Sequence, residues 1–251
     1  MRPLLPVLLF LLAGCSSASA PDDARGDLGR LSFRFDGPGC SPFDGCSPRQ
    51  SIARGAHVVL SARGDDAGAD YHGTIRAPGL VIEQEGLACM CTEQLEGGGS
   101  QGWSPGPGQQ CGARASTTCA RTFLLRAEQV GTVTLEVTGP NGDLVDKIAL
   151  GIVQPARLEP VVSAARPAGG TLDPLLPVAD GTFATDLPMD LYFDTKAVDA
   201  RGVELRKGKD DVTFAGEAVV FGSMSKPRQP ADIRVDATGL GLTSTFLVRA
   251  R

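Results

Sequence analysis

The chain has few of the residue types from which catalytic and metal centres are usually built. Its 251 residues include two histidines, two tyrosines and one tryptophan. We expect His57 on the outward face of a strand and His72 in a turn. Neither has a cysteine or another histidine at the spacing of metal ligands, so both are expected to be surface residues. No intact nucleophile or phosphate-loop motif is present. We therefore predict a protein that is not an enzyme and that holds no cofactor and no metal.

An excess of positive charge is also lacking. Lysine and arginine number 24 against 29 aspartates and glutamates, which gives a formal net charge of −5. Because phosphate contacts need clustered lysine and arginine, this balance argues against nucleic acid as a partner. The hydrophobic content of 42% is ordinary, so the chain can bury a core and is not expected to be disordered throughout.

Long apolar segments are missing except near the N-terminus. Residues 1–14 carry one charge, at Arg2, followed by an apolar run too short to cross a bilayer, which takes roughly 20 residues. The run ends in Leu12-Ala13-Gly14-Cys15. This tetrapeptide resembles the signal box of bacterial lipoproteins. The resemblance implies that residues 1–14 are a signal peptide and that Cys15 receives the lipid. The alternative is an ordinary signal peptide cut near Ala18 or Ala20, which would discard Cys15.

The lipoprotein resemblance also implies a location. More than one acyl chain on Cys15 would give a stable membrane anchor. Serine rather than aspartate at position 16 favours the outer membrane, so the expected site is the bacterial cell envelope. Residues 15–29 have no apolar periodicity and are predicted to be a flexible tether between the lipid and the folded part.

From Leu31 onward the dominant pattern is the alternation of apolar and polar residues over short runs. The runs are separated by turn residues, which is consistent with 32 glycines and 18 prolines. Residues 133–153 form a strand, an Asn-Gly turn and a second strand, and residues 233–250 repeat this ending. The repetition predicts an all-β protein of two tandem immunoglobulin-like antiparallel sandwiches, at residues 30–154 and 157–251. Residues 218–221 are among the expected strands of the second sandwich.

The second sandwich contains motifs of a known kind of repeat. The segment Ala197-Val198-Asp199-Ala200-Arg201-Gly202 has an Ala-x-Asp-x-x-Gly turn, Val212-Thr213-Phe214 forms a short strand, and Thr245–Val248 belongs to the closing strand. These elements resemble bacterial immunoglobulin-like (Big-type) repeats over about 60 residues. The first unit shares only its closing hairpin with that pattern.

Six cysteines remain after Cys15, and all of them precede residue 120. An exported protein lies in an oxidising compartment, so disulfides are expected, although the spacing does not fix their connectivity. We favour Cys40–Cys46, with Cys89 and Cys91 bonded to Cys111 and Cys119. These bonds would hold an insertion at residues 83–120, in which residues 87–96 could form a short helix. The alternative is a Cu(I) site at Cys89-Met90-Cys91.

The insertion contains the only tryptophan, Trp103, within a Gly/Pro-rich loop. A loop tryptophan most often covers apolar surface, but it can also be a contact for an envelope protein or a glycan. Unpaired sheet edges are the other candidate surfaces, because they can accept a partner strand. The sequence thus predicts a lipid-anchored, non-catalytic protein that acts by binding, adhesion or scaffolding. Alternatives are a copper-handling protein and an accessory domain of an exported enzyme.

Overall fold

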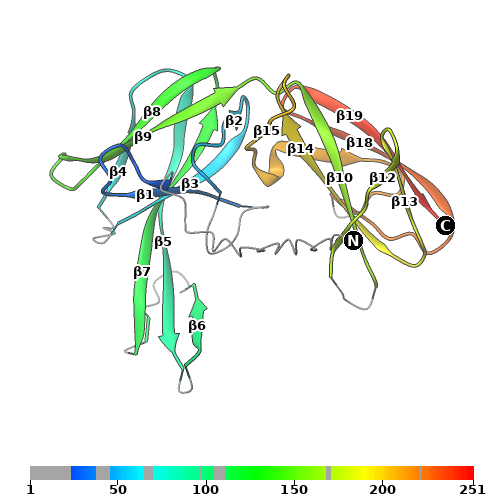
Figure 1. Cartoon of the computed structure of the whole chain (residues 1–251), viewed down its shortest axis with the longest axis horizontal. Coiled ribbons are helices and arrows are strands. Elements are labelled where there is room, and N and C mark those ends of the chain that lie inside the picture. The colour runs from blue at the N-terminus through cyan, green and yellow to red at the C-terminus, as the bar shows by residue number, and fades with distance from the viewer. Residues whose placement is uncertain are drawn as a thin grey trace, which may run out of the picture.

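The computed structural model describes residues 24–37, 46–64, 70–95, 98–104, 111–112, 114–167, 171–220 and 222–251. Within these residues the chain forms β-strands, turns and a 3-10 turn at Lys209–Asp211, with no α-helix. No helix of this part of the chain is long and apolar enough to cross a membrane. The strands build four sheets, arranged as two sandwiches that lie side by side (Figure 1).

The first sandwich uses strands between Ser32 and Val153. One sheet has the order β1-β3-β7-β5-β6 and the other has the order β2-β9-β8-β4. The strands of the first sheet are β1 (Ser32–Asp36), β3 (His57–Arg63), β5 (Leu80–Gln94), β6 (Ser100–Trp103) and β7 (Ala115–Ala127). Those of the second sheet are β2 (Ile52–Ala53), β4 (His72–Ile75), β8 (Gly131–Thr138) and β9 (Leu144–Val153).

The second sandwich uses strands between Arg157 and Ala250. One sheet has the order β11-β10-β14-β15, with β17 also paired to β14, and the other has the order β12-β13-β19-β18-β16. The strands of the first sheet are β10 (Arg157–Ala165), β11 (Asp173–Pro174), β14 (Asp190–Val198), β15 (Glu204–Leu205) and β17 (Met224–Ser225). Those of the second are β12 (Pro177–Ala179), β13 (Thr182–Thr185), β16 (Val212–Ala215), β18 (Ala231–Gly239) and β19 (Leu242–Ala250).

The sheets that contain the closing hairpins share one arrangement in the two sandwiches. In each, the last two strands form an antiparallel hairpin, β8–β9 or β18–β19. A short early strand runs parallel to the last one, β2 to β9 and β13 to β19. A fourth strand, β4 or β16, pairs with the other side of the hairpin. This arrangement opposite a second antiparallel sheet is the immunoglobulin-like sandwich that the alternating runs predict.

Alternation along the strands places one face of each sheet in the core. In β1, Phe33 and Phe35 are buried while Ser32 and Arg34 are only partly covered. In the second sandwich the core is built around Phe193, Phe246 and Phe183, with the ring of Phe246 in edge contact with both others, at centroid distances of 5.7 and 6.1 Å. Such edge contacts add to the stabilisation that comes from burying the rings.

The Ala-x-Asp-x-x-Gly turn has a clear physical basis. The carboxylate of Asp199 accepts the backbone N–H of Arg201 at 2.9 Å and that of Val203 at 2.8 Å. Gly202 has φ +81°, a conformation that favours glycine. The hydrogen bond from Val203 and the neighbouring Arg201, acting against partial burial, hold the pKa of Asp199 below its usual value. The motif therefore fixes the direction in which the chain leaves β14 and returns as β15.

Four local expectations differ from the structure. Residues 24–29, expected within the tether, form a turn in which Asp27 N–H donates to Lys147 O at 2.8 Å and Asp146 accepts the N–H of Leu28. Residues 87–94 are part of strand β5 and not of a helix. His72 begins β4 and does not lie in a turn. Residues 217 and 218 form a turn and Val220 makes one isolated bridge to Met224, so the short apolar run that follows Gly216 does not form a strand.

Candidate functional site

An arm, made of β6 and the outer parts of β5 and β7, extends from the first sandwich. Strands β5 and β7 pair from Leu80–Ala127 at the core to Glu93–Ala115 at the far end, and β6 adds to β5 over Cys91–Gln94 (Figure 1). The segment expected to be a loop insertion therefore consists largely of core strands that continue beyond the sandwich. Continuous backbone pairing gives it an ordered shape without a hydrophobic core of its own.

Two disulfides cross the arm. Cys89 and Cys119 face each other in the β5–β7 register and are bonded, with Cα atoms 4.0 Å apart. Cys91 is bonded to Cys111, with Cα atoms 5.5 Å apart. The structure thus joins the cysteines of the Cys-x-Cys pair to the two later ones, as the sequence suggested. With both sulfurs of Cys89 and Cys91 in disulfides, no thiolate pair is present there for Cu(I).

The remaining residues singled out by sequence have different outcomes. Cys15 and Cys40 lie outside the described residues, and Cys46 is disulfide-bonded. Trp103 is the last residue of β6, opposite Cys91 in the register. In the part of the chain that the structure describes, no group of three or more His, Cys, Asp or Glu side chains could hold a metal ion.

The arm presents apolar side chains and a strand edge. Leu87 and Leu95 are 43% and 47% exposed. Strand β3 pairs with β7 only along Arg121–Arg126, so no described strand covers the outer edge of β7 at Ala115–Ala120. This edge reads Ala-Ser-Thr-Thr-Cys-Ala and has no charge, although natural edge strands commonly carry charged residues that discourage pairing with other chains.

The base of the arm is held by an ion pair that sequence analysis missed. Arg121 Nη2 of β7 lies 2.6 Å from Glu85 Oε2 of β5, and Glu85 Oε1 accepts the N–H of Gly73 at 2.8 Å. His72 Nδ1 is 3.2 Å from the same carboxylate. Burial by itself raises the pKa of Glu85, but the hydrogen bonds from Arg121, Gly73 and His72 outweigh it and bring the pKa below its usual value.

A second missed feature is the seam, which we define as the contact between residues 51–57 of the first sandwich and 206–211 of the second. Arg206 N–H donates to Ser51 O at 2.7 Å, and Ala53 N–H donates to Arg206 O at 2.9 Å. Ile52 and Arg206 thereby form a parallel bridge between the sandwiches. Gly208 passes so close to the carbonyl of His57 that a Cβ at position 208 would clash with it.

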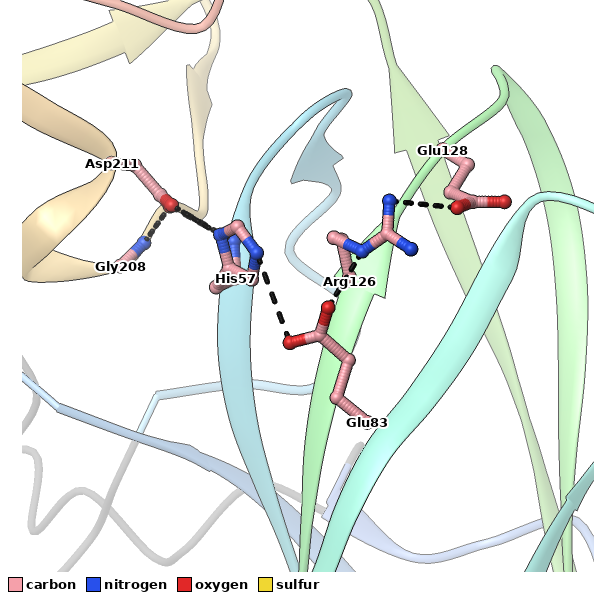
Figure 2. Close-up of polar contacts among 6 residues, drawn as sticks. All are labelled: His57, Glu83, Arg126, Glu128, Gly208 and Asp211. Atoms are coloured by element: carbon pink, nitrogen blue, oxygen red, sulfur yellow. Dashed lines mark hydrogen bonds and ion pairs between the residues drawn. The ribbon is translucent and has the colours of Figure 1, made fainter.

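A chain of charged side chains continues from the seam across β3, β5 and β7 (Figure 2). Asp211, whose side chain is 4% exposed, accepts the backbone N–H of His57 at 3.0 Å and lies 2.8 Å from its Nδ1. His57 Nε2 is 3.8 Å from Glu83, which binds Arg126 at 2.6 Å. Arg126 also contacts Glu128 at 2.7 Å. Glu83 first, and then Glu128, raise the pKa of Arg126.

Residue types alone give no signal for the seam. His57 and Asp211 are 154 positions apart. His57 begins β3 and Asp211 precedes β16, and neither position carries a motif. His57 is exposed on one side, as expected, but it also bridges the two sandwiches. The imidazole contacts Glu83 of the first sandwich and Asp211 of the second, so His57 links the two sandwiches.

Comparison with known proteins finds no matching family and no matching curated protein. Among solved structures, domains 5–6 of the S-layer protein SbsC share 14% identity over 81% of this chain and 93% of that one, with a TM-score of 0.28. The C-terminal domain of the Streptococcus agalactiae AgI/II polypeptide BspA shares 9% identity over 87% and 99%, with a TM-score of 0.26. TM-scores this low do not establish a common fold, so the class of these domains rests on their own topology.

Proposed function

We propose that the chain is a lipid-anchored protein of the bacterial cell envelope that acts by binding, adhesion or scaffolding, without catalysis, and that the arm is its partner-binding element. The arm is the single observation that carries the binding role. It extends from the first sandwich and its outer β7 edge is uncharged. One disulfide joins β5 to β7, and the other joins β5 to the segment before β7.

The construction of the arm favours binding over a purely structural role. A sheet held by disulfides is already ordered before a partner binds. It therefore loses little conformational freedom on binding, which leaves more of the contact energy for affinity. The β7 edge at Ala115–Ala120 offers backbone donors and acceptors to an extended strand of a partner. Leu87 and Leu95 supply exposed apolar area on β5 and at its end. Trp103, at the end of β6, is a third candidate contact.

The binding role is tested by cross-linking in intact envelopes followed by pull-down of the chain. Three variants change the arm: Leu87→Ser, Leu95→Ser and Trp103→Ala. Val130→Ser is the matched control, because Val130 is 56% exposed and follows the end of β7 that points away from the arm. We expect the arm variants to lose cross-linked species that wild type and Val130→Ser retain. The same species in all five samples would remove the arm from the binding role.

The anchor has a separate test. The support for it is the sequence Leu12-Ala13-Gly14-Cys15 after a charged residue and an apolar run. We expect Cys15→Ala to move the protein from the membrane fraction to the soluble fraction and to remove the mass of the lipid from the mature chain. Retention of the variant in the membrane fraction would refute the lipid anchor and leave the arm hypothesis untouched.

A further inference from the structure

A pocket of about 620 Å³ lies on the first sandwich, where residues 24–31 lead into strand β1. Its lining comes from the turn before β1, from Ser32 at the start of β1 and from Arg63 at the end of β3, together with Tyr71 and Val145. The volume is in the range of small-ligand sites, so the pocket has room for a small ligand.

Three arginines, Arg25, Arg30 and Arg63, belong to this lining. Arg25 is opposite Ser32 in an antiparallel bridge, and Ser32 is opposite Arg63 in the β1–β3 register. Side chains at directly opposed positions of antiparallel strands leave the sheet on the same face. Arg25, Ser32 and Arg63 therefore form one row across the sheet, and Arg30 joins them from the turn before β1.

The positive charge of this row is not balanced by neighbouring side chains. Within the described residues, Arg25, Arg30 and Arg63 make no ion pair, and their one side-chain hydrogen bond runs from Arg25 Nη1 to Gly29 O at 3.2 Å. Other arginines of the chain bind a carboxylate, as Arg76 does. The pocket thus concentrates positive charge in a chain whose formal net charge is −5.

Several carboxylates are near in sequence but are not part of the described lining. Asp27 and Asp70 are exposed to solvent. Asp146 is fully buried, and its oxygens accept backbone N–H groups of the turn before β1 at 2.7–2.8 Å. Asp65 and Asp66 lie outside the described residues. Because like charges at neighbouring positions repel, an anion bound among the three arginines would stabilise this part of the sandwich.

We propose that this pocket binds a phosphate group, either free or carried by a lipid headgroup, among the guanidinium groups of Arg25, Arg30 and Arg63. Arginine suits phosphate because its fork of N–H donors binds two oxygens at once and because it stays charged at physiological pH. Ser32 and Tyr71 bring hydroxyl donors to the same lining.

A lipid is one of the two sources because of the place of the pocket in the chain. Ten positions separate Arg25 from Cys15, and an extended chain of that length spans at most about 35 Å. A chain anchored at Cys15 would hold the pocket within reach of membrane phosphates. Binding of the phosphate group itself requires neither the anchor nor the arm, so the proposal can fail without them and they without it.

The test is titration of the full chain carrying Cys15→Ala, so that no attached lipid competes, followed by backbone amide NMR at constant ionic strength. One series uses inorganic phosphate, and the other uses dihexanoyl phosphatidylglycerol below its micelle concentration. We expect saturable shifts at Gly29, Ser32 and Gly64. A lower Kd for inorganic phosphate identifies free phosphate as the ligand, and a lower Kd for the lipid identifies the headgroup.

Arg25→Gln and Arg63→Gln should each raise the lower Kd about tenfold, as loss of one charge-assisted hydrogen bond does. Arg25 is exposed, so Arg25→Gln should fold, and unchanged amide shifts in the β8–β9 hairpin verify the fold of each variant. Arg249→Gln, exposed on β19 of the second sandwich, is the charge-matched control. Shifts that do not saturate in either series, or an equal rise in Kd in Arg249→Gln, would show only a general response to net charge and would overturn the proposal.

Discussion

The imidazole Nδ1 of His57 lies 2.8 Å from Oδ1 of Asp211. This contact joins the start of β3 in the first sandwich to the 3-10 turn before β16 in the second. The same carboxylate accepts the backbone N–H groups of His57 and Gly208. One side chain therefore serves three donors from both sandwiches. Together with the backbone bridge at Arg206, it makes the seam a specific joint.

Asp211→Ala should weaken this joint. Loss of the acceptor leaves two backbone N–H groups unpaired, and each costs about 1–3 kcal/mol where water cannot replace the partner. We expect a lower guanidinium midpoint and faster amide exchange at His57 and Gly208. Asp210→Ala is the matched control, because Asp210 is exposed in the same turn. Equal effects of the two substitutions would show that the turn matters and the carboxylate does not.

Asp146→Ala should detach residues 24–31 from the first sandwich. The Asp146 carboxylate is fully buried and accepts the N–H groups of Leu28, Arg30 and Leu31 at 2.7–2.8 Å. Leaving these donors without an acceptor should lower the free energy of unfolding by about 3 kcal/mol. Urea denaturation measures the change, and proteolysis near Arg25 and Arg30 reports the detachment. Asp143→Ala, in the exposed turn before β9, is the control. If Arg25 and Arg30 stay protected from proteolysis in both variants, the prediction is contradicted.

Removing the Cys89–Cys119 bond by the double substitution to serine should loosen the arm. The bond closes a loop with a sequence separation of 30, for which chain entropy gives a stabilisation of about 3–4 kcal/mol. We expect faster amide exchange at Ser116–Thr118 in the variant and unchanged exchange in the β18–β19 hairpin. Unchanged exchange in the arm would mean that strand pairing and the remaining Cys91–Cys111 bond are enough to maintain it.

Stability at the base of the arm should depend on pH through Glu85. The pKa of this carboxyl is lowered in the folded chain from a reference value of 4.5. Its contribution is therefore fully present above that reference value and is lost as pH falls through the folded pKa. Glu85→Gln should accordingly cost stability at pH 6 and progressively less towards pH 3. The measurement is urea unfolding over this range, with Glu217→Gln in the second sandwich as the control. A wild-type minus Glu85→Gln difference that stays constant with pH would exclude this linkage.

The strands that enclose the core could be predicted from sequence because one face of each sheet is buried. Phe33 and Phe35, Val133 and Leu135, and Ile233 and Val235 are apolar at every second position and buried in the structure. The closing hairpins were predictable for a similar local reason, since their turns contain Gly142 and Gly241 at positive φ. The strand predicted at residues 218–221 was wrong at residues 218–220, because an apolar run without alternation does not identify a strand.

The arm and the seam depend on pairings that have no local signature. Alternation in Leu80–Gln94 fades beyond Ile82 because neither face of the arm is buried in a core, so the sequence there predicted a loop or a helix. His57 and Asp211, or Ile52 and Arg206, meet only because each sandwich brings its own strand ends to the same side.

The sequence by itself determined the all-β class, the repeated closing hairpin and the location of the cysteines, because periodicity, turn residues and composition act over a few neighbouring positions. Only the tertiary structure decided that β5 and β7 continue as an arm, how its cysteines pair, and which side chains link the sandwiches. Those features depend on contacts between residues far apart in the chain, whose partners are selected by the folded geometry of both sheets and not by the residues on either side.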